Sequence, residues 1–284
     1  MSISRLASFL AIFTILGIAL VLAQPSLTPP AGPIAESGRY GTLIEVNDDT
    51  APGNGSFRHV ISQPGSYILV SNIDTGTSNG ILIDSDNVTL DLNGYTLEGS
   101  GEKGIAVPVE GGLGRSFEGI TVRDGRIVGY DTGIRGFEFN TNFLTNNFTS
   151  TLFSGLDIRA TDVGIVFDFG IVERCNVVSG RLGIDCFGST VTDTVVRVNA
   201  EAGVAATAFR AVRSVIRTCH AITFVDGTGG GIGFDLSRTL VTGSRADVSQ
   251  TGFSLNTGDI ATGCLSNAST NFVSATSQTT DSNF

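Results

Sequence analysis

The chain has 284 residues, of which 37 are Gly, 18 are Phe and none is Trp, and only 15% are charged. Its 17 Lys and Arg residues against 27 Asp and Glu residues give a formal charge of −10, which excludes the cationic surface that nucleic acids and anionic lipids require. A hydrophobic content of 41% excludes a disordered polyelectrolyte. Abundant Gly, Thr, Ser, Asn and Val oppose long surface helices, so the composition predicts an all-β domain.

The N-terminus has the pattern of an export signal. Arg5 precedes an apolar run over residues 6–23, which Gln24 and a proline follow. We interpret residues 1–23 as a signal peptide cleaved after the last alanine of the run. The alternative is an uncleaved anchor, since the run approaches the ~20 residues that span a bilayer. Cleavage predicts a secreted or cell-surface protein without further membrane contact, in which residues 24–50 are a linker.

The rest of the chain is repetitive. A glycine followed by alternating β-branched or aromatic residues recurs at Gly80, Gly104, Gly133, Gly164, Gly183, Gly203, Gly231 and Gly252, with a degenerate last copy at Asn271. A second strand signal lies between these copies, for example at Val172–Val177. Two short strands per repeat, with repeats of variable length, are typical of a solenoid, whereas a propeller needs about 40 residues per blade. The repeats predict a parallel β-helix.

The first copies carry a family resemblance. The segments 65–69, 80–83 and 86–97 resemble the opening of right-handed parallel β-helix proteins of the pectin-lyase-like superfamily. The resemblance implies an all-β, single-stranded right-handed parallel β-helix (solenoid) of about nine coils. We expect an N-terminal capping strand segment over 51–75, the β-helix over 76–273 and a C-terminal tail over 274–284. The superfamily contains lyases, hydrolases, epimerases, tail spikes and adhesins, so it does not fix an activity.

Two rows of residues are predicted inside the coils. An aliphatic row follows the repeat glycines, namely Ile81, Ile105, Ile165, Ile184 and Ile232. A row of small residues comprises Cys175, Thr194, Cys219, Ser244 and Cys264, which occupy equivalent positions in successive coils. Cysteines two coils apart are almost 10 Å from each other at ~4.8 Å per coil, which is beyond disulfide reach. A bridge between Cys175 and Cys186 stays open.

Acidic residues are the candidates for catalysis. Glycan hydrolysis needs carboxylates roughly 5 to 10 Å apart. Asp84, Asp168 and Asp235 each lie four residues after a repeat glycine, on the same face but three coils apart. A closer group consists of Asp157, Asp162, Asp168 and Asp185, for which solvated aspartates at coil edges are the structural alternative. The Asn-Thr-Asp, Gly-His-Gly and Arg-Ile-Lys motifs of polygalacturonases are absent, which favours a non-catalytic protein.

The longest interval between repeats contains aromatic residues interleaved with amides. We expect Asn142, Phe143, Asn146, Asn147 and Phe148 to contact carbohydrate, because aromatic rings stack on sugars and amides bond to hydroxyls. The structural alternative is a lateral loop whose phenylalanines pack on the coil.

No metal or cofactor is predicted. The glycine-rich stretch 226–235 lacks the helix that follows a dinucleotide-binding loop, and it has no second copy to complete a Ca²⁺ site. The two histidines, His59 and His220, are far apart in the sequence, so a zinc site is not expected and His220 is interpreted as a structural residue.

Three functional hypotheses follow from these patterns. The first is an exported, non-catalytic β-helix that binds polysaccharide or presents a surface to it. The second is a divergent polysaccharide lyase or glycoside hydrolase, and the third is a structural surface or appendage component.

Overall fold

The computed structural model of the chain describes residues 42–107, 117–136, 150–226, 229–274 and 278–280. Every described residue belongs to one compact unit, Tyr40–Phe284. The described residues contain β-strands and no helix, as the composition predicts. No helix in these ranges is long and apolar enough to cross a bilayer, and the apolar run at 6–23 lies outside them.

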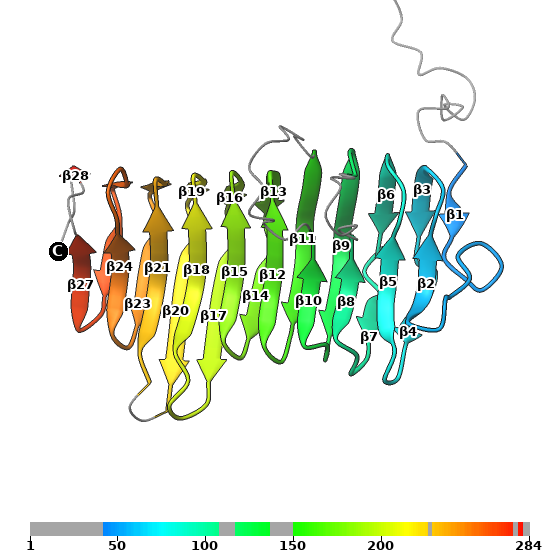
Figure 1. The fold of residues 1–284 in the computed structure, drawn as a ribbon, viewed down its shortest axis with the longest axis horizontal. Coiled ribbons are helices and arrows are strands. Elements are labelled where there is room, and N and C mark those ends of the chain that lie inside the picture. The colour runs from blue at the N-terminus through cyan, green and yellow to red at the C-terminus, as the bar shows by residue number, and fades with distance from the viewer. Residues whose placement is uncertain (1–41, 108–116, 137–149, 227–228, 275–277, 281–284) are drawn as a thin grey trace, which may run out of the picture. The chain divides into compact units, whose positions relative to one another are not determined.

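The strands form one ten-stranded sheet and one eighteen-stranded sheet (Figure 1). Sheet 1 is the ten-stranded one: β2 (Phe57–Ile61), β5 (Asn79–Ile83), β8 (Lys103–Ala106), β10 (Thr132–Arg135), β12 (Val163–Asp168), β15 (Leu182–Phe187), β18 (Ala206–Val212), β21 (Gly231–Ser237), β24 (Thr251–Leu255) and β27 (Thr270–Ser274).

The larger sheet consists of two ladders that share the long strands β9 and β11. Ladder 2 contains β1 (Ile44–Glu45), β3 (Gly65–Ile68), β6 (Val88–Asp91), the first halves of β9 (Ile120–Val128) and β11 (Thr151–Arg159), β13 (Gly170–Glu173), β16 (Thr190–Thr192), β19 (Val215–Arg217), β22 (Leu240–Thr242), β25 (Ile260–Thr262) and β28 (Gln278–Thr280). Ladder 3 contains β4 (Ile73–Asp74), β7 (Thr96–Glu98), the second halves of β9 and β11, β14 (Asn176–Ser179), β17 (Val195–Ala200), β20 (His220–Val225), β23 (Arg245–Val248) and β26 (Leu265–Asn267).

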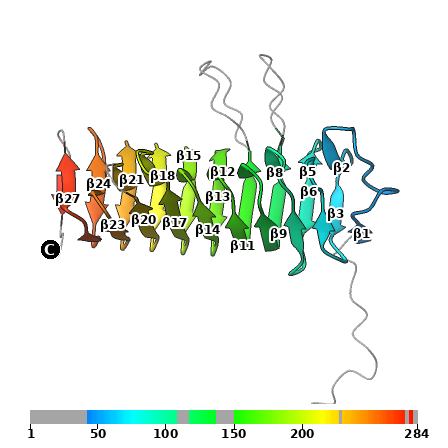
Figure 2. The same ribbon diagram turned by 90° about the horizontal axis from the view of Figure 1, so that it is seen from below.

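In each winding the chain passes through sheet 1, then ladder 2, then ladder 3, and returns to sheet 1. All pairings between windings are parallel and place equivalent residues side by side, as Ile165 beside Ile184 and Val172 beside Val191. Figures 1 and 2 show the strands of successive windings lying next to one another along one axis. This arrangement is an all-β parallel β-helix, as the repeats predict.

One inward row of sheet 1 fills the coil with isoleucines first and phenylalanines afterwards. In register, it consists of His59, Ile81, Ile105, Ile134, Ile165, Ile184, Phe209, Phe234, Phe253 and Phe272. The five isoleucines are fully buried. The four phenylalanine rings stack with centroid distances of 4.8, 4.7 and 4.9 Å. Four of the five predicted isoleucines are thereby confirmed as core residues.

The prediction for the fifth isoleucine, Ile232, is wrong. It pairs with Thr207 and Thr251 on the outward side of sheet 1, and Phe234 takes the inward position. Side chains alternate along a strand, so the two-residue shift arises from the choice of Gly231 as the repeat glycine. The equivalent glycine is Gly233.

The same register corrects Gly203, whose place in the repeat is taken by Ala208. The repeat glycines allow a close approach between sheet 1 and ladder 3: a Cβ atom added to Gly183 would lie 2.0 Å from Cγ1 of Val196. At Ala208, the ladder 3 residue that follows Val196 in register is the smaller Ala221. The methyl group that Ala208 adds on sheet 1 is therefore compensated by a smaller side chain on ladder 3.

The corner between sheet 1 and ladder 2 depends on a left-handed residue in four consecutive windings of the described chain. Phe169, Gly188, Arg213 and Arg238 have φ values of 52°, 61°, 52° and 54°. A buried hydroxyl follows in three of these windings: Ser189 N donates to Ser214 Oγ at 3.1 Å, and Ser214 N donates to Thr239 Oγ1 at 3.2 Å. These bonds satisfy backbone groups that the turn removes from the ladders.

The corner between ladders 2 and 3 carries the predicted row of small residues, with Cys175, Thr194, Cys219, Ser244 and Cys264 all buried. Here too a backbone amide bonds to the next winding, since Cys219 N donates to Ser244 Oγ at 3.2 Å. The stack is confirmed. All four cysteines are free, so Cys175 and Cys186 are not bridged.

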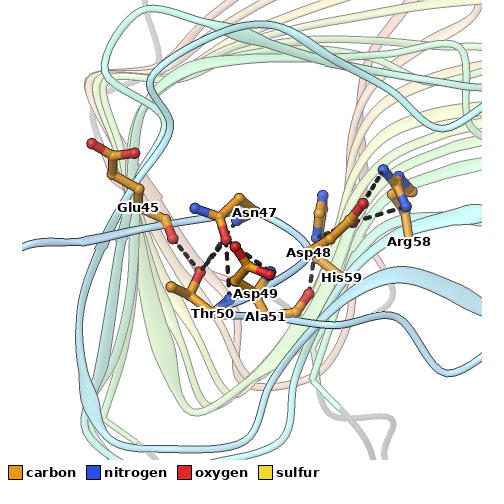
Figure 3. Close-up of polar contacts among 8 residues, drawn as sticks. All are labelled: Glu45, Asn47, Asp48, Asp49, Thr50, Ala51, Arg58 and His59. Carbon is orange, nitrogen blue, oxygen red and sulfur yellow. Dashed lines mark hydrogen bonds and ion pairs between the residues drawn. The ribbon is translucent and has the colours of Figure 1, made fainter.

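A short loop lies at the N-terminal end of the coil (Figure 3). Asn47 Oδ1 accepts hydrogen bonds from the backbone N–H groups of Asp49 and Thr50, at 2.9 and 3.0 Å. Ala51 is fully buried, and its carbonyl lies 2.9 Å from Nδ1 of the buried His59. Strands β2 and β3 pair in register with β5 and β6, so the segment 57–68 forms part of the ladders that this loop adjoins.

Replacing Ile165 by Ala is expected to destabilise the protein by about 2 to 4 kcal/mol, because the cavity left between windings collapses only in part. Ile232→Ala is the matched control and is expected to cost under about 1 kcal/mol, since that side chain faces outward. The free energies of unfolding in denaturant titrations give both values. Equal losses in the two variants would contradict the register.

The four thiols are expected to be inert in the folded protein. Burial raises the pKa of Cys175 to about 11 and the pKa values of Cys186 and Cys219 to about 12. Since the thiolate is the reactive form, labelling with an aromatic disulfide at pH 8 should detect no thiol before unfolding and four thiols after it. Fast labelling of the native protein would contradict the buried corner row.

Candidate functional site

The outward face of sheet 1 contains a groove of about 880 Å³ between β8 and β21. Its lining combines five arginines and five acidic residues with aliphatic side chains. The charged members are Arg135, Arg181, Arg210, Arg213, Arg238, Glu102, Asp131, Asp162, Asp168 and Asp185. The chain as a whole has 17 cationic and 27 acidic residues, so the groove is enriched in cations.

In the middle of the groove, Val166, Asp185 and Arg210 are neighbours in one outward row of sheet 1. Asp235 follows Arg210 in register and is not part of the groove lining. Arg210 donates two hydrogen bonds to Asp185, one of them from Nε to Oδ1 at 2.9 Å. The hydrogen bond to this carboxylate raises the pKa of the Arg210 guanidinium above its ordinary value. Desolvation by burial raises the pKa of Asp235 at the end of the row.

A second ion pair lies at the edge where the strands of sheet 1 begin. Arg181 binds Asp162 through two hydrogen bonds of 2.8 Å, which is the bidentate geometry that guanidinium and carboxylate groups prefer. Thr161, next to Asp162, donates a hydrogen bond from Oγ1 to Asp131 of the preceding winding at 2.9 Å. The groove floor is therefore held by charge pairs that bridge one winding to the next.

The opposite edge is aromatic and cationic. Phe187 and Phe169 meet edge to face with their ring centroids 5.3 Å apart. The Arg213 guanidinium lies over the Phe187 ring, 5.5 Å from its centroid. Asp168, which is 8% exposed, lies beside Phe187 in the register of sheet 1.

Three of the four acidic candidates line this groove, namely Asp162, Asp168 and Asp185. Asp157 does not: it lies on ladder 3, where Arg126 and Arg159 contact it at 3.2 and 3.4 Å. The carbohydrate-binding candidates Asn142, Phe143, Asn146, Asn147 and Phe148 lie outside the described residues.

The arginines were missed by the sequence analysis. Arg181 and Asp162 are 19 residues apart, and Arg210 and Asp185 are 25 residues apart, so neither pair has a local signal. A signal exists only in the repeat alignment, where Asp185 follows Gly183 by two residues and Arg210 follows Ala208 by two. The misplaced glycine at 203 concealed it.

A smaller polar cluster lies on ladder 3. His220 Nε2 is 2.8 Å from Asp247 Oδ2, and Arg245 donates two hydrogen bonds of 2.8 and 2.9 Å to the same carboxylate. These bonds, the Arg245 pair first, lower the pKa of Asp247. In the ranges that the structure covers, no three His, Cys, Asp or Glu side chains are placed to hold a metal ion.

No family model matches the chain, and no curated protein matches it. Among solved structures, the chain is similar to the Dettilon tailspike protein, with 8% sequence identity and a TM-score of 0.39. The match covers 80% of this chain and 61% of that chain, so this chain spans about three fifths of the tailspike protein's length. The parallel β-helix itself is defined by the strand pairing of this chain.

Proposed function

We propose that the protein is an exported, right-handed β-helix of the pectin-lyase-like type that binds polysaccharide in the groove of sheet 1 without cleaving it. The observation that carries this proposal is the groove itself, in which fixed charge pairs alternate with aliphatic and aromatic side chains. Sugars present hydroxyl groups and apolar ring faces together, and such a lining complements both.

The ion pairs favour recognition of hydroxyl groups. A carboxylate has about four lone-pair sites and a guanidinium has five donors, so Asp185 and Arg210 keep hydrogen-bonding capacity after binding each other. Each pair joins two neighbouring windings and is thereby held in one orientation. Preorganised polar groups lose little conformational entropy when a ligand binds.

The same pairs argue against catalysis. In Asp162 each of the two carboxylate oxygens accepts a guanidinium hydrogen bond, and the same holds in Asp185. A general acid or base must exchange a proton with the substrate, and a carboxylate neutralised by arginine is a poor candidate for that role. The alternative is a polysaccharide lyase or glycoside hydrolase, which is favoured by the presence of Asp162, Asp168 and Asp185 in one groove.

The binding site is tested with a matched pair of double variants. Asp185→Asn with Arg210→Gln removes both charges of the groove pair, so that no unpaired charge remains. Asp247→Asn with Arg245→Gln removes the equivalent bidentate pair on ladder 3. Affinity electrophoresis through a panel of neutral and acidic polysaccharides should show that the unmodified protein is retained. The Kd should rise by about tenfold or more in the groove double variant and stay unchanged in the ladder 3 double variant.

Two outcomes would contradict this proposal. Equal loss of retention in both double variants would remove the groove as the site. Release of reducing ends or of unsaturated, ultraviolet-absorbing products from the same panel would select the enzyme instead.

Export is tested separately. The mature protein is expected to begin at Gln24, because signal peptidase cleaves after small residues that follow an apolar segment. Intact-mass measurement of protein recovered outside the cell gives the N-terminus directly. Recovery of the chain with residues 1–23 attached would contradict cleavage.

A further inference from the structure

We propose that the outer face of ladder 2 is an interface between two copies of this chain, which pack against each other with their coil axes antiparallel. The face consists of the side chains that β9, β11, β13, β16, β19, β22 and β25 turn away from the core. None of the residues that line the groove of sheet 1 lies on these strands. The inference is therefore independent of the proposed glycan binding.

The first outward row of this face contains no charged side chain. In register it runs over seven windings and consists of Thr121, Leu152, Ile171, Thr190, Val215, Leu240 and Ile260. Ile171 and Ile260 are each 44% exposed. By contrast, outward rows carry Asp185 and Arg210 on sheet 1, and Arg245 on ladder 3. A continuous row of exposed aliphatic side chains is a surface of the kind that marks protein interfaces.

The second outward row, two residues further along each strand, is rich in threonine and holds one acidic and one basic residue. In register it consists of Glu173, Thr192, Arg217, Thr242 and Thr262. Glu173 and Arg217 lie one winding to either side of Thr192, so the two charges are symmetric about that winding.

Both charges are available to a second copy. Arg217 is exposed and forms no ion pair within the part of the chain that the structure describes. Glu173 contacts the neighbouring Arg174, whose side chain is 64% exposed. Such exposed ion pairs contribute little to stability, so Glu173 can take a better-oriented partner at small cost.

The symmetric placement selects one orientation of the two copies. A two-fold axis parallel to the strands inverts the order of the windings and places each row opposite the same row of the second copy. When this axis passes beside the winding of Thr192, Glu173 faces Arg217 of the second copy, and the reverse contact follows by symmetry. Ile171 then faces Val215 of the second copy in the same way.

The parallel orientation is disfavoured by the same rows. A two-fold axis along the coil would place the apolar row opposite the threonine row of the second copy, winding by winding. Ile171 would then face Glu173, and Val215 would face Arg217. Each contact would bury a charge against an aliphatic side chain without a partner, which is costly.

The charge of the whole protein also favours this face. With a formal charge of −10, two copies repel each other, so they associate most readily through a surface whose own charges cancel. The two outward rows of ladder 2, from Glu173 to Thr262, carry one acidic and one basic side chain and are neutral together.

The size of the face predicts a weak dimer. Seven windings at about 4.8 Å each make a face roughly 30 Å long, and two outward rows lie about 7 Å apart. Such a face is smaller than the roughly 800 Å² per partner of a standard stable interface. The dimer is therefore expected to dissociate in the micromolar range.

The test exchanges the two facing charges. Sedimentation velocity of the purified full-length protein, over a concentration series that spans the micromolar range, should show the mean mass rise from one chain towards two. Glu173→Arg or Arg217→Glu alone places like charges opposite each other, so each should weaken the dimer by about tenfold or more. An equimolar mixture of these two single variants should dimerise again, because every facing pair then has opposite charges.

Arg197→Glu is the matched control, since this exposed arginine lies on ladder 3 and forms no ion pair among the described residues. It changes the net charge as much as Arg217→Glu does and should leave the dimer intact. Unchanged melting temperatures show that the variants are folded. A protein that stays monomeric throughout the series overturns the proposal, and so does a dimer that both single variants retain. Folded single variants whose mixture stays monomeric overturn the antiparallel contact.

Discussion

The structure depends on in-register parallel pairing between successive windings. Because each residue lies beside its equivalent in the next winding, any property of one position is repeated along the whole coil. Stacked isoleucine and phenylalanine side chains therefore fill the interior as one continuous row. The same rule applies to polar groups, so the serine and threonine hydroxyls at the corner form a chain of hydrogen bonds that no single winding could make.

The groove is a product of the same rule on the outside of the coil. Asp185 and Arg210 are adjacent only because two strands of sheet 1 are paired in register. Their separation of 25 residues is the length of one winding. The charge of Asp185 on one strand is thus compensated by Arg210 in the next winding. The groove lining comes from several windings, so the groove extends along the coil axis.

Much of the fold could be predicted from the sequence, because glycine followed by β-branched residues marks most strands of sheet 1. The prediction failed where the mark is ambiguous: Ala208 replaces the glycine in one winding, and Gly231 and Gly233 compete in another. Of the site, three aspartates were predicted, and the arginine partners of Asp162 and Asp185 were not. Pairing across windings depends on the register, and the choice of Gly203 in place of Ala208, five residues later, was enough to hide it.

Loop lengths vary between windings, whereas the pairing of the corners is constant. Ser189 and Ser214 are 25 residues apart and equivalent in position, and Gly170 and Ser189 are equivalent at 19 residues. Removal or duplication of one such period would join equivalent positions and leave every ladder continuous. The molecule can therefore change length in whole windings during evolution, and the length of the sheet 1 groove would change with it, without redesign of the core.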